Sequence, residues 1–451
     1  MTEWVKELER RLGKERIFTS PVVRQCYGRD FAPTEPSYLP QAVVMVRDEP
    51  EVVAVLELAH RKRVPVVPRG AGTGVAGGAV AIRGGMVLDL SLMNRVLRVD
   101  PEEFLVVVQP GVVWAELNRS LAAHSLLAPS VPGSGRVSTV GGTVAAGGSG
   151  MRSLRYGTIR EQVLGLAVVL PGGKTLRVGG KTFKSACGYS LKDLLVGSEG
   201  TLGVITEITL RVWPRPPATL LVEAAAARLE EVPAVFRRLR QAGVLPSAFE
   251  LIPSGSLVTV GERPKAGEAW LMVEFQGSEA EIEAAEALAR TLLPDSEICF
   301  WRSEPEQARR WQWYSEVYYR LVRLRPALWA EDLGVPLAAV PGLLKEAENR
   351  ARELGVSAGF VSHAGDGTIH CVISVDPSDP EEMERARRLR EELYRRVLEL
   401  GGTITAEHGV GARRSSFGRL QLGPALELMR QIKAVFDPHG IMNPGKLGLE
   451  D

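Results

Sequence analysis

Cysteine is scarce in this sequence, and its distribution excludes whole classes of metal site. Cys26, Cys187, Cys299 and Cys371 are the only four among 451 residues, and no two of them form a CxxC pair. Zinc ribbons and iron–sulfur clusters need thiolates at close, repeated spacings. The sequence therefore predicts neither kind of site.

Long apolar runs and an excess of one charge are also missing. No uninterrupted apolar stretch approaches the roughly 20 residues that cross a bilayer, and segment 1–15 is charged and amphipathic. The net charge of +1 and the pI near 7.7 give no general attraction for nucleic acid or anionic membranes. With 45% apolar and 24% charged residues, we expect a folded cytoplasmic protein with two or three cores.

Histidine is rare as well, but three of the six histidines fall in two glycine-rich segments. His363 and His370 flank one of these segments, and Glu407-His408 lies in the other. Two imidazoles and a carboxylate are a ligand set for a divalent metal, and a further histidine is a base with a pKa near neutral pH. We expect the first pair on a strand end and on the next strand, 368–375, joined by a tight turn. The alternative is a structural role, which we assign to the isolated His60, His124 and His439.

A glycine-rich loop follows a predicted helix, 51–63, and a short predicted strand, 64–67. Five glycines occur between residues 70 and 78. A loop so poor in side chains can point successive backbone N–H groups at a phosphate. Its G-x-G-x-x-G pattern is not a Rossmann fingerprint, because a strand, 86–90, follows where a helix should begin, and no Walker Gly-Lys-Ser/Thr is present. We expect another kind of phosphate loop; a flexible surface loop is the alternative.

Proline marks the expected domain boundary. Residues 214–217 contain three prolines, which stop both helix and sheet. Helical and strand patterns alternate on both sides of this boundary, and a second glycine-rich tract spans 132–150. These patterns favour an α+β protein whose sheets are covered by helices. The expected parts are a helical segment 1–35, a domain 36–215 and a domain 216–451.

Taken together, these motifs resemble those of a known family. The matching segments, which occur in order and at family-like separations, are 68–78, 197–203, 363–370, 407–411 and 436–446. Over nearly its whole length the chain resembles the FAD-linked 2-hydroxy-acid oxidoreductases of the vanillyl-alcohol-oxidase superfamily. The resemblance implies an α+β fold with a PCMH-type (p-cresol-methylhydroxylase-type) FAD-binding domain. A substrate-capping α+β domain of the FAD-linked oxidase C-terminal type would follow it.

The resemblance also implies roles for individual residues. His363, His370 and Glu407 would bind a divalent metal (zinc, manganese or iron), and His408 would be the catalytic base. FAD would be bound non-covalently, because neither glycine tract contains histidine or cysteine. Its implied contacts are Pro68, Arg69, Gly70, Ala71, Gly72, Thr73, Gly74 and Gly77 in the first loop, Gly133, Ser138, Gly142 and Gly150 in the second tract, Val204 and Ile205 at the adenine, and Asn443 in the tail.

The implied activity is oxidation of a small D-2-hydroxy acid, D-lactate or glycolate, to the 2-oxo acid. The substrate would chelate the metal through its hydroxyl and carboxylate, His408 would take the hydroxyl proton, and hydride would pass to flavin N5. Electrons would then go to oxygen, a quinone, an electron-transfer flavoprotein or an iron–sulfur subunit. A partner of this kind would account for any attachment to a membrane, a homodimer is left open, and no nucleic acid is expected.

Departures from the family pattern leave alternatives open. Residues 147–150 read Gly-Gly-Ser-Gly where the family has Asn-Ala-Gly-Gly, and Thr368 replaces an asparagine. Tyr314 stands where the family arginine would grip the substrate carboxylate, and a tyrosine cannot supply that cationic fork. Arg310, Arg320 or the metal alone would then hold the carboxylate.

Two other functions are therefore kept as alternatives. The first is a flavin-binding subunit of a larger redox complex whose own substrate site is degenerate. The second is an FAD enzyme that acts on another alcohol, such as an alkyl-glycerone-phosphate synthase. The metal-ligand set disfavours the second alternative, and the intact His363, His370, Glu407 and His408 disfavour the first.

Overall fold

The computed structural model divides into two compact units and describes residues 2–31, 38–226, 228–263, 267–293 and 297–450. The N-terminal unit comprises Met1–Gly150, Gly157–Arg215 and Glu407–Asp451; the C-terminal unit comprises Met151–Tyr156 and Pro216–Ala406. The expected domains 36–215 and 216–451 are continuous in sequence, whereas these units are not. Residues 151–156 belong to the C-terminal unit, although they precede the predicted boundary. The tail 407–451 belongs to the N-terminal unit, although it follows that boundary.

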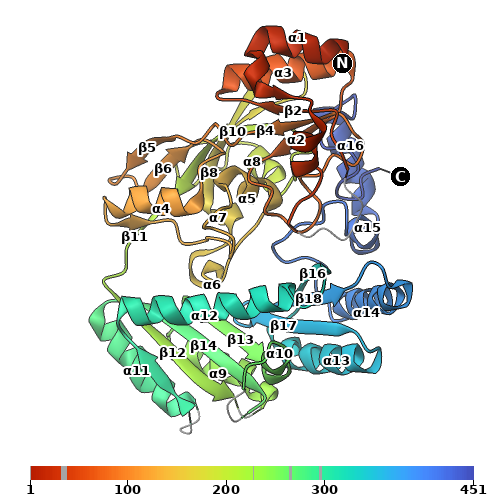
Figure 1. The fold of residues 1–451 in the computed structure, drawn as a ribbon. Helices are drawn as coiled ribbons and strands as arrows, with labels where there is room; N and C mark the ends of the chain where they lie inside the picture. Colours follow the sequence, from red (N-terminus) through yellow and green to blue (C-terminus); the bar gives the residue numbers. More distant parts are fainter. Residues whose placement is uncertain (1, 32–37, 227, 264–266, 294–296, 451) are drawn as a thin grey trace. The chain divides into compact units, whose positions relative to one another are not determined.

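Short strands and helices build the N-terminal unit (Figure 1). Its helices are α1 (Glu3–Leu12), α2 (Pro21–Cys26), α3 (Glu49–Lys62), α4 (Trp114–Ala122), α5 (Val140–Ala146), α7 (Ile159–Gln162), α8 (Leu191–Leu195), α15 (Ser415–Leu422) and α16 (Ala425–Phe436). Its strands are β1 (Ile17–Phe18), β2 (Ala42–Met45), β3 (Val66–Arg69), β4 (Met86–Asp89), β5 (Val96–Asp100), β6 (Leu105–Val108), β7 (Leu126–Leu127), β8 (Val163–Val169), β9 (Thr175–Gly179), β10 (Val204–Arg211) and β11 (Trp213–Pro214). The two larger sheets have the orders β1-β2-β4-β3 and β5-β6-β10-β8-β9.

The helix predicted over 51–63 is α3, and its ends follow from local chemistry. The Asp48 side chain accepts a hydrogen bond from the Glu51 N–H, which satisfies a backbone donor that has no partner inside the helix. A left-handed residue, Arg63, ends the helix. Its apolar side chains at Val52 and Val55 are buried in the core beneath the four-stranded sheet.

The C-terminal tail belongs to the N-terminal unit because it pairs with β3. The Val66 N–H donates to the Ile441 carbonyl at 2.8 Å, and the Asn443 N–H donates to the Val66 carbonyl at 2.8 Å. Met442 is fully buried in the same core. The tail therefore ends beside the loop that follows β3.

The C-terminal unit is a seven-stranded sheet with helices (Figure 1). Its strands are β12 (Ala218–Ala226), β13 (Ala248–Pro253), β14 (Ala269–Gly277), β15 (Cys299–Trp301), β16 (Ala327–Gly334), β17 (Ser357–His363) and β18 (Thr368–Val375), in the order β15-β12-β14-β13-β17-β18-β16. Its helices are α6 (Ser153–Tyr156), α9 (Val232–Gln241), α10 (Ser254–Thr259), α11 (Glu279–Leu292), α12 (Glu304–Val322), α13 (Val340–Glu353) and α14 (Pro380–Glu399).

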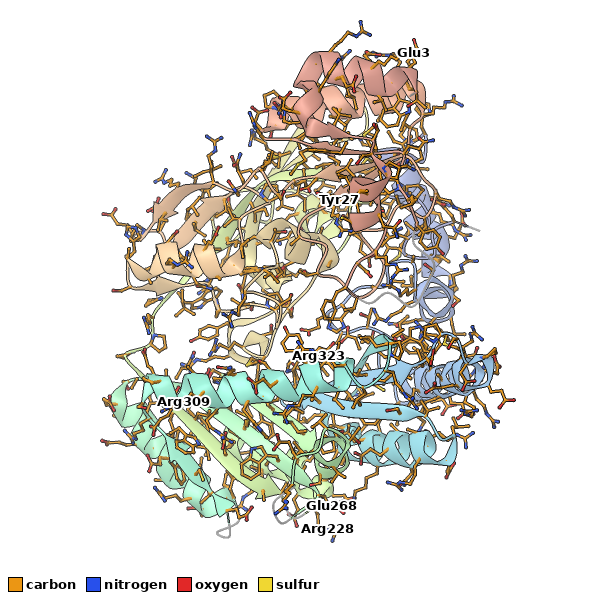
Figure 2. All side chains as sticks on the ribbon, viewed as in Figure 1. Glu3, Tyr27, Arg228, Glu268, Arg309 and Arg323 are labelled. Carbon is orange, nitrogen blue, oxygen red and sulfur yellow. The ribbon has the colours of Figure 1, made fainter. Side chains whose placement is uncertain are left out.

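Helix α12 packs on one face of this sheet. Tyr314 and Val317 lie in one buried cluster with Met272 of β14 and Val361 of β17. Figure 2 labels Arg309, which lies in this helix, and Arg323, which directly follows its last residue. The rings of the aromatic-rich segment therefore serve chiefly as a packing stripe.

The register of the strands places ionisable residues on that same face. Met272 lies opposite Glu223 on one side and opposite Glu250 on the other. His370 likewise lies opposite Val361 and opposite Asp332. Because residues directly opposite each other in adjacent strands point to one face, a row of polar side chains crosses the sheet.

No helix within the part of the chain that the structure describes is long and apolar enough to cross a membrane.

Candidate functional site

The first glycine-rich histidine segment is a hairpin, as its sequence predicts. His363 is the last residue of β17, and His370 is the third residue of β18. Gly367 in the turn has φ +88°, and a Cβ there would collide with the carbonyl oxygen of Val335. Glycine therefore permits the tight turn that brings the two histidines to one end of the strand pair.

The two imidazoles meet edge to face. His363 and His370 are 8% and 6% exposed, and their ring centroids are 4.8 Å apart at an interplanar angle of 87°. Their Nε2 atoms are 3.1 Å apart. Two ring nitrogens therefore converge on one point inside the C-terminal unit.

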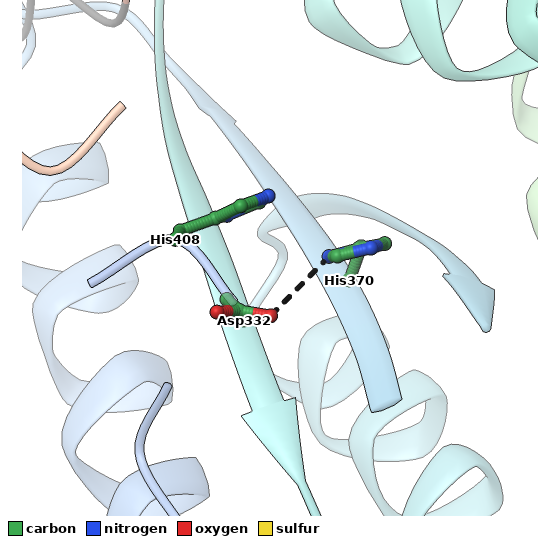
Figure 3. Close-up of side chains that lie close together, drawn as sticks. All are labelled: Asp332, His370 and His408. Atoms are coloured by element: carbon green, nitrogen blue, oxygen red, sulfur yellow. Dashed lines mark ion pairs between the residues drawn. The ribbon is translucent and has the colours of Figure 1, made fainter. Parts of the chain in front are cut away.

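Buried carboxylates stand behind both rings. Glu250 Oε2 of β13 is 2.6 Å from His363 Nδ1, and Asp332 Oδ1 of β16 is 3.6 Å from His370 Nδ1 (Figure 3). Both carboxylate side chains have no exposed surface. Neither residue was predicted from the sequence, although a charged residue inside a buried, largely apolar strand is a signal that could have identified them.

Tyr314, which stands at the position of the arginine in the family pattern, contacts a carboxylate of the protein itself. It is 5% exposed, and its hydroxyl donates a 2.5 Å hydrogen bond to Glu250 Oε2. The two arginines named as substitutes are also engaged: Arg310 pairs with Glu223 at 2.6 Å and Arg320 with Glu262 at 2.5 Å. Tyr314 thus supports His363 through Glu250.

The second histidine segment is anchored at both ends. Asp332 Oδ2 accepts hydrogen bonds from Thr405 Oγ1 at 2.7 Å and from the Ala406 N–H at 2.9 Å, within the C-terminal unit. The division between the units falls directly after Ala406. The convergence of Glu407 and His408 with the two buried histidines stays a prediction.

Within the N-terminal unit, Glu199 holds the other end of that segment. Its carboxylate accepts hydrogen bonds from the Val410 N–H at 2.7 Å and from the Gly411 N–H at 2.8 Å. The Ala412 N–H donates to the carbonyl of Ala76 at 3.0 Å. The segment that carries Glu407 and His408 is therefore hydrogen-bonded to the glycine-rich loop.

The glycine-rich loop is fixed by side chains on either side of it. Arg69 Nη1 donates to the carbonyls of Arg29 and Ala79 at 2.9 and 3.2 Å. The Arg69 guanidinium also lies 5.2 Å from the ring centre of Tyr27, labelled in Figure 2. The Gly77 N–H donates to the Asp30 carboxylate at 2.6 Å. These contacts argue against a merely flexible surface loop.

Several of the residues predicted to contact FAD have a polar atom without a partner or open space beside them. Ser138 Oγ and Asn443 Oδ1 are buried and have no hydrogen-bond partner among the residues that the structure describes. A side chain at Gly74 would meet open space, whereas one at Gly70 would collide with Thr139. Buried polar atoms without partners are costly unless a ligand satisfies them, so this cradle fits a polar cofactor.

The other residues predicted to contact FAD differ in how closely the protein packs around them. A Cβ at Gly133 would meet open space, whereas one at Gly150 would collide with the Val131 carbonyl. Gly142 lies in α5, and the side chains of Val204 and Ile205 are buried in apolar cores. Gly150, Val204 and Ile205 therefore also have packing roles.

Two buried charged residues of this unit, Glu199 and Lys446, were not predicted from the sequence. Burial raises the pKa of Glu199 and lowers the pKa of Lys446 to about 8. Lys446 Nζ donates to the Val80 carbonyl at 2.8 Å, and Asn443 Nδ2 donates to the carbonyls of Gly78 and Glu199 at 2.8 and 2.6 Å. The motifs at 197–203 and 436–446 thus meet at the loop.

Comparisons with known proteins agree with this arrangement. One family model, "FAD linked oxidases, C-terminal domain", matches residues 215–447, and another, "FAD binding domain", matches residues 40–179. The glycolate oxidase subunit GlcD of Bacillus subtilis (strain 168) is 33% identical over 449 residues, covering 97% of this chain and 95% of that protein. A D-lactate dehydrogenase of Anaerostipes hadrus is 31% identical over 464 residues, covering 99% and 97%.

Solved structures support the fold. p-Cresol methylhydroxylase matches with a TM-score of 0.82 at 18% identity, over 99% of this chain and 96% of that one. Alkyldihydroxyacetonephosphate synthase matches with a TM-score of 0.77 at 21% identity, over 98% and 84%.

The fold and the matched models define an FAD-linked oxidoreductase with a PCMH-type FAD-binding domain and an α+β C-terminal domain, as predicted. The chain belongs to the FAD-linked oxidase family, together with proteins named glycolate oxidase subunit and D-lactate dehydrogenase.

Proposed function

We propose that this protein oxidises a small D-2-hydroxy acid, D-lactate or glycolate, to the 2-oxo acid with FAD and a divalent metal. The observation that carries the proposal is the pair of buried imidazoles whose Nε2 atoms are 3.1 Å apart, each with a carboxylate beside its Nδ1. The names of the two relatives supply the substrate class.

The histidine pair suits a metal ion. Two nitrogens that are each about 2.1 Å from a zinc ion, at an angle near 100°, lie roughly 3.2 Å apart. A carboxylate beside Nδ1 fixes the tautomer that directs Nε2 at the metal. His363 and His370 would hold the ion, with Glu407 as the third ligand. When bound, the metal would lower the pKa of the substrate hydroxyl, and FAD would accept the hydride.

Glu407 and His408 are the proposed third ligand and base because of their place in the chain. Glu407 directly follows Ala406, whose N–H is held by Asp332 beside His370, and consecutive Cα atoms are about 3.8 Å apart. His408 is the proposed base for the hydroxyl proton, because its ordinary pKa lies near operating pH. Its neighbour Glu407 has a carboxylate oxygen 3.6 Å from His408 Nε2.

The proposed FAD contacts are the loop 68–78 and the residues around Ser138 and Asn443. The loop offers backbone N–H groups and one cation, Arg69, to a pyrophosphate. Asn443 joins the cradle from the tail, because its Nδ2 bonds to Gly78. Non-covalent attachment predicts that denaturation releases the flavin into solution.

One experiment separates the roles of Glu407 and His408. Glu407→Gln should lose metal and activity together, with partial recovery at high metal concentration by mass action. His408→Ala should keep metal and FAD but reduce its flavin at least about a hundredfold more slowly, as expected when a general base is removed. The measurement is metal content beside stopped-flow flavin reduction.

Two results would count against this function. If the Glu407→Gln variant retains its metal, Glu407 is not a metal ligand. Wild-type flavin reduction by His408→Ala, with every 2-hydroxy acid tested in the presence of zinc or manganese, would favour the alternative of a flavin-binding subunit. The same screen, run with a dye, a quinone and an electron-transfer flavoprotein in parallel, would identify the class of electron acceptor.

A further inference from the structure

A second cluster of charged side chains lies on the histidine face of the seven-stranded sheet. The Arg152 guanidinium, just before α6, pairs side-on with Glu274 of β14: Nε is 2.8 Å from Oε1 and Nη2 is 2.7 Å from Oε2. Glu274 is buried and also accepts hydrogen bonds from Ser247 Oγ at 2.6 Å and Trp311 Nε1 at 3.2 Å. The carboxylate that orients Arg152 is therefore itself fixed.

Strand register places this pair close to the histidines. Glu274 lies opposite Ala248 on β13, and Glu250, two residues further along that strand, points to the same face. Glu250 contacts His363. The charge of Glu274, and to a smaller extent that of Glu250, raises the pKa of Arg152. Arg152 is thus a permanent cation beside the histidine pair.

One nitrogen of this guanidinium remains available. Glu274 accepts hydrogen bonds from Nε and Nη2, and Nη1 donates no hydrogen bond to a residue that the structure describes. The Arg152 side chain is 32% exposed, whereas its partner carboxylate is 2% exposed. A guanidinium held on one edge can still donate two hydrogen bonds from its remaining nitrogen.

We propose that Arg152 binds the carboxylate of the substrate through Nη1, and so does the work of the cation that Tyr314 does not supply. The ligand class that this subsite selects is a small carboxylate anion; a neutral amide of the same shape lacks the charge that a guanidinium recognises. The assignment rests on the proposed function for the identity of the reaction but concerns binding alone.

The test is anaerobic calorimetric binding of D-lactate and of its neutral amide, lactamide, to protein loaded with zinc and with chemically reduced FAD, which cannot oxidise the ligand. Arg152→Gln should weaken D-lactate binding about ten- to a hundredfold, as expected for the loss of one charge-assisted hydrogen-bonded pair, and leave lactamide binding unchanged. Arg152→Lys keeps the charge beside Glu274 but loses the fork. It should therefore fold like the wild type and weaken D-lactate binding by a smaller factor.

Arg325→Gln is a matched control. Arg325 is 50% exposed and pairs with a buried carboxylate, Glu382, at 3.6 Å, but that carboxylate belongs to α14 and not to the sheet. It should bind D-lactate like the wild type.

Unchanged D-lactate affinity in both Arg152 variants, with FAD and zinc retained, would overturn the proposal, as would equal weakening by Arg325→Gln. Wild-type protein that binds D-lactate through Arg152 but never reduces its flavin would contradict the proposed function while upholding this subsite.

Discussion

The two candidate sites of this protein are built from opposite materials. In the N-terminal unit, the loop 68–78 offers backbone groups, and side chains such as Asp30 and Arg69 hold its shape. In the C-terminal unit, buried ionisable side chains on neighbouring strands form the site, and the backbone only sets their spacing. A backbone site should therefore fail when glycine is replaced, and a side-chain site when a charge or a ring is removed.

The largest effect is expected at the histidine pair. His370→Ala removes one of two converging nitrogens and should lower metal affinity and flavin reduction by at least about a hundredfold, since even outer partners of metal ligands are worth 10- to 100-fold. FAD content should stay normal, because the residues proposed to bind FAD lie in the other unit. Metal analysis and flavin absorbance on the same sample check both statements; loss of FAD together with metal would break the separation.

The loop should respond in the opposite way. A side chain at Gly74 meets open space, and Gly74 does not have a positive φ. Gly74→Val should therefore leave the stability of FAD-free protein unchanged but abolish FAD retention, because the branched side chain would occupy the phosphate space.

Gly411→Ala is the matched control for the loop. Gly411 has φ +55°, and a Cβ there would collide with the Ala76 carbonyl. The variant should lose about 2–4 kcal/mol of stability in urea unfolding whether or not FAD is present. Normal flavin content in Gly74→Val would show that the loop does not bind the phosphate.

These differences explain what the sequence could and could not predict. Glycine clusters and the paired histidines are visible as local patterns, so the loop, the hairpin 363–370 and the α+β fold were all expected. Glu250 and Asp332 lie far from the histidines in sequence, and only the strand register brings them to His363 and His370. Long-range pairing of this kind leaves no local periodicity to read.

Tyr314 illustrates the same limit. The family pattern shows that this position lacks the expected arginine. The hydrogen-bond partner of Tyr314, Glu250, depends on how α12 packs across the sheet and cannot be read from the sequence. The discontinuous units have the same cause. No composition change marks residues 151–156, and they join the C-terminal unit through contacts such as the 2.7 Å hydrogen bond from the Tyr156 hydroxyl to Gln276.

A smaller effect is expected from the buried lysine of the N-terminal unit. Burial lowers the pKa of Lys446 from about 10.5 to about 8. Between these values the unfolded chain binds more protons than the folded chain, so this group adds stability as the pH rises from 8 to 10.5. Below pH 8 both states are protonated, and the full cost of burying the charge remains.

Lys446→Met tests that contribution. The gain in stability between pH 8 and pH 10 that the lysine provides, about 2 kcal/mol from the size of the shift, should be missing from the variant. Urea unfolding of both proteins at the two pH values measures it. If the difference in unfolding free energy between the two proteins does not change with pH, the pKa of Lys446 is not lowered in the folded state.

The smallest effect is expected at Tyr314, and it probes the boundary between packing and function inside the C-terminal site. Tyr314→Phe keeps the ring in its buried cluster but removes the hydrogen bond to Glu250, which should cost about 1 kcal/mol of stability. Because Glu250 orients His363, zinc affinity should also fall, by roughly tenfold, at the lower end of the range for outer partners of metal ligands. FAD content should not change. Zinc titration beside thermal unfolding separates these contributions, and a variant that loses stability while binding zinc like the wild type would show that Tyr314 only packs against the sheet.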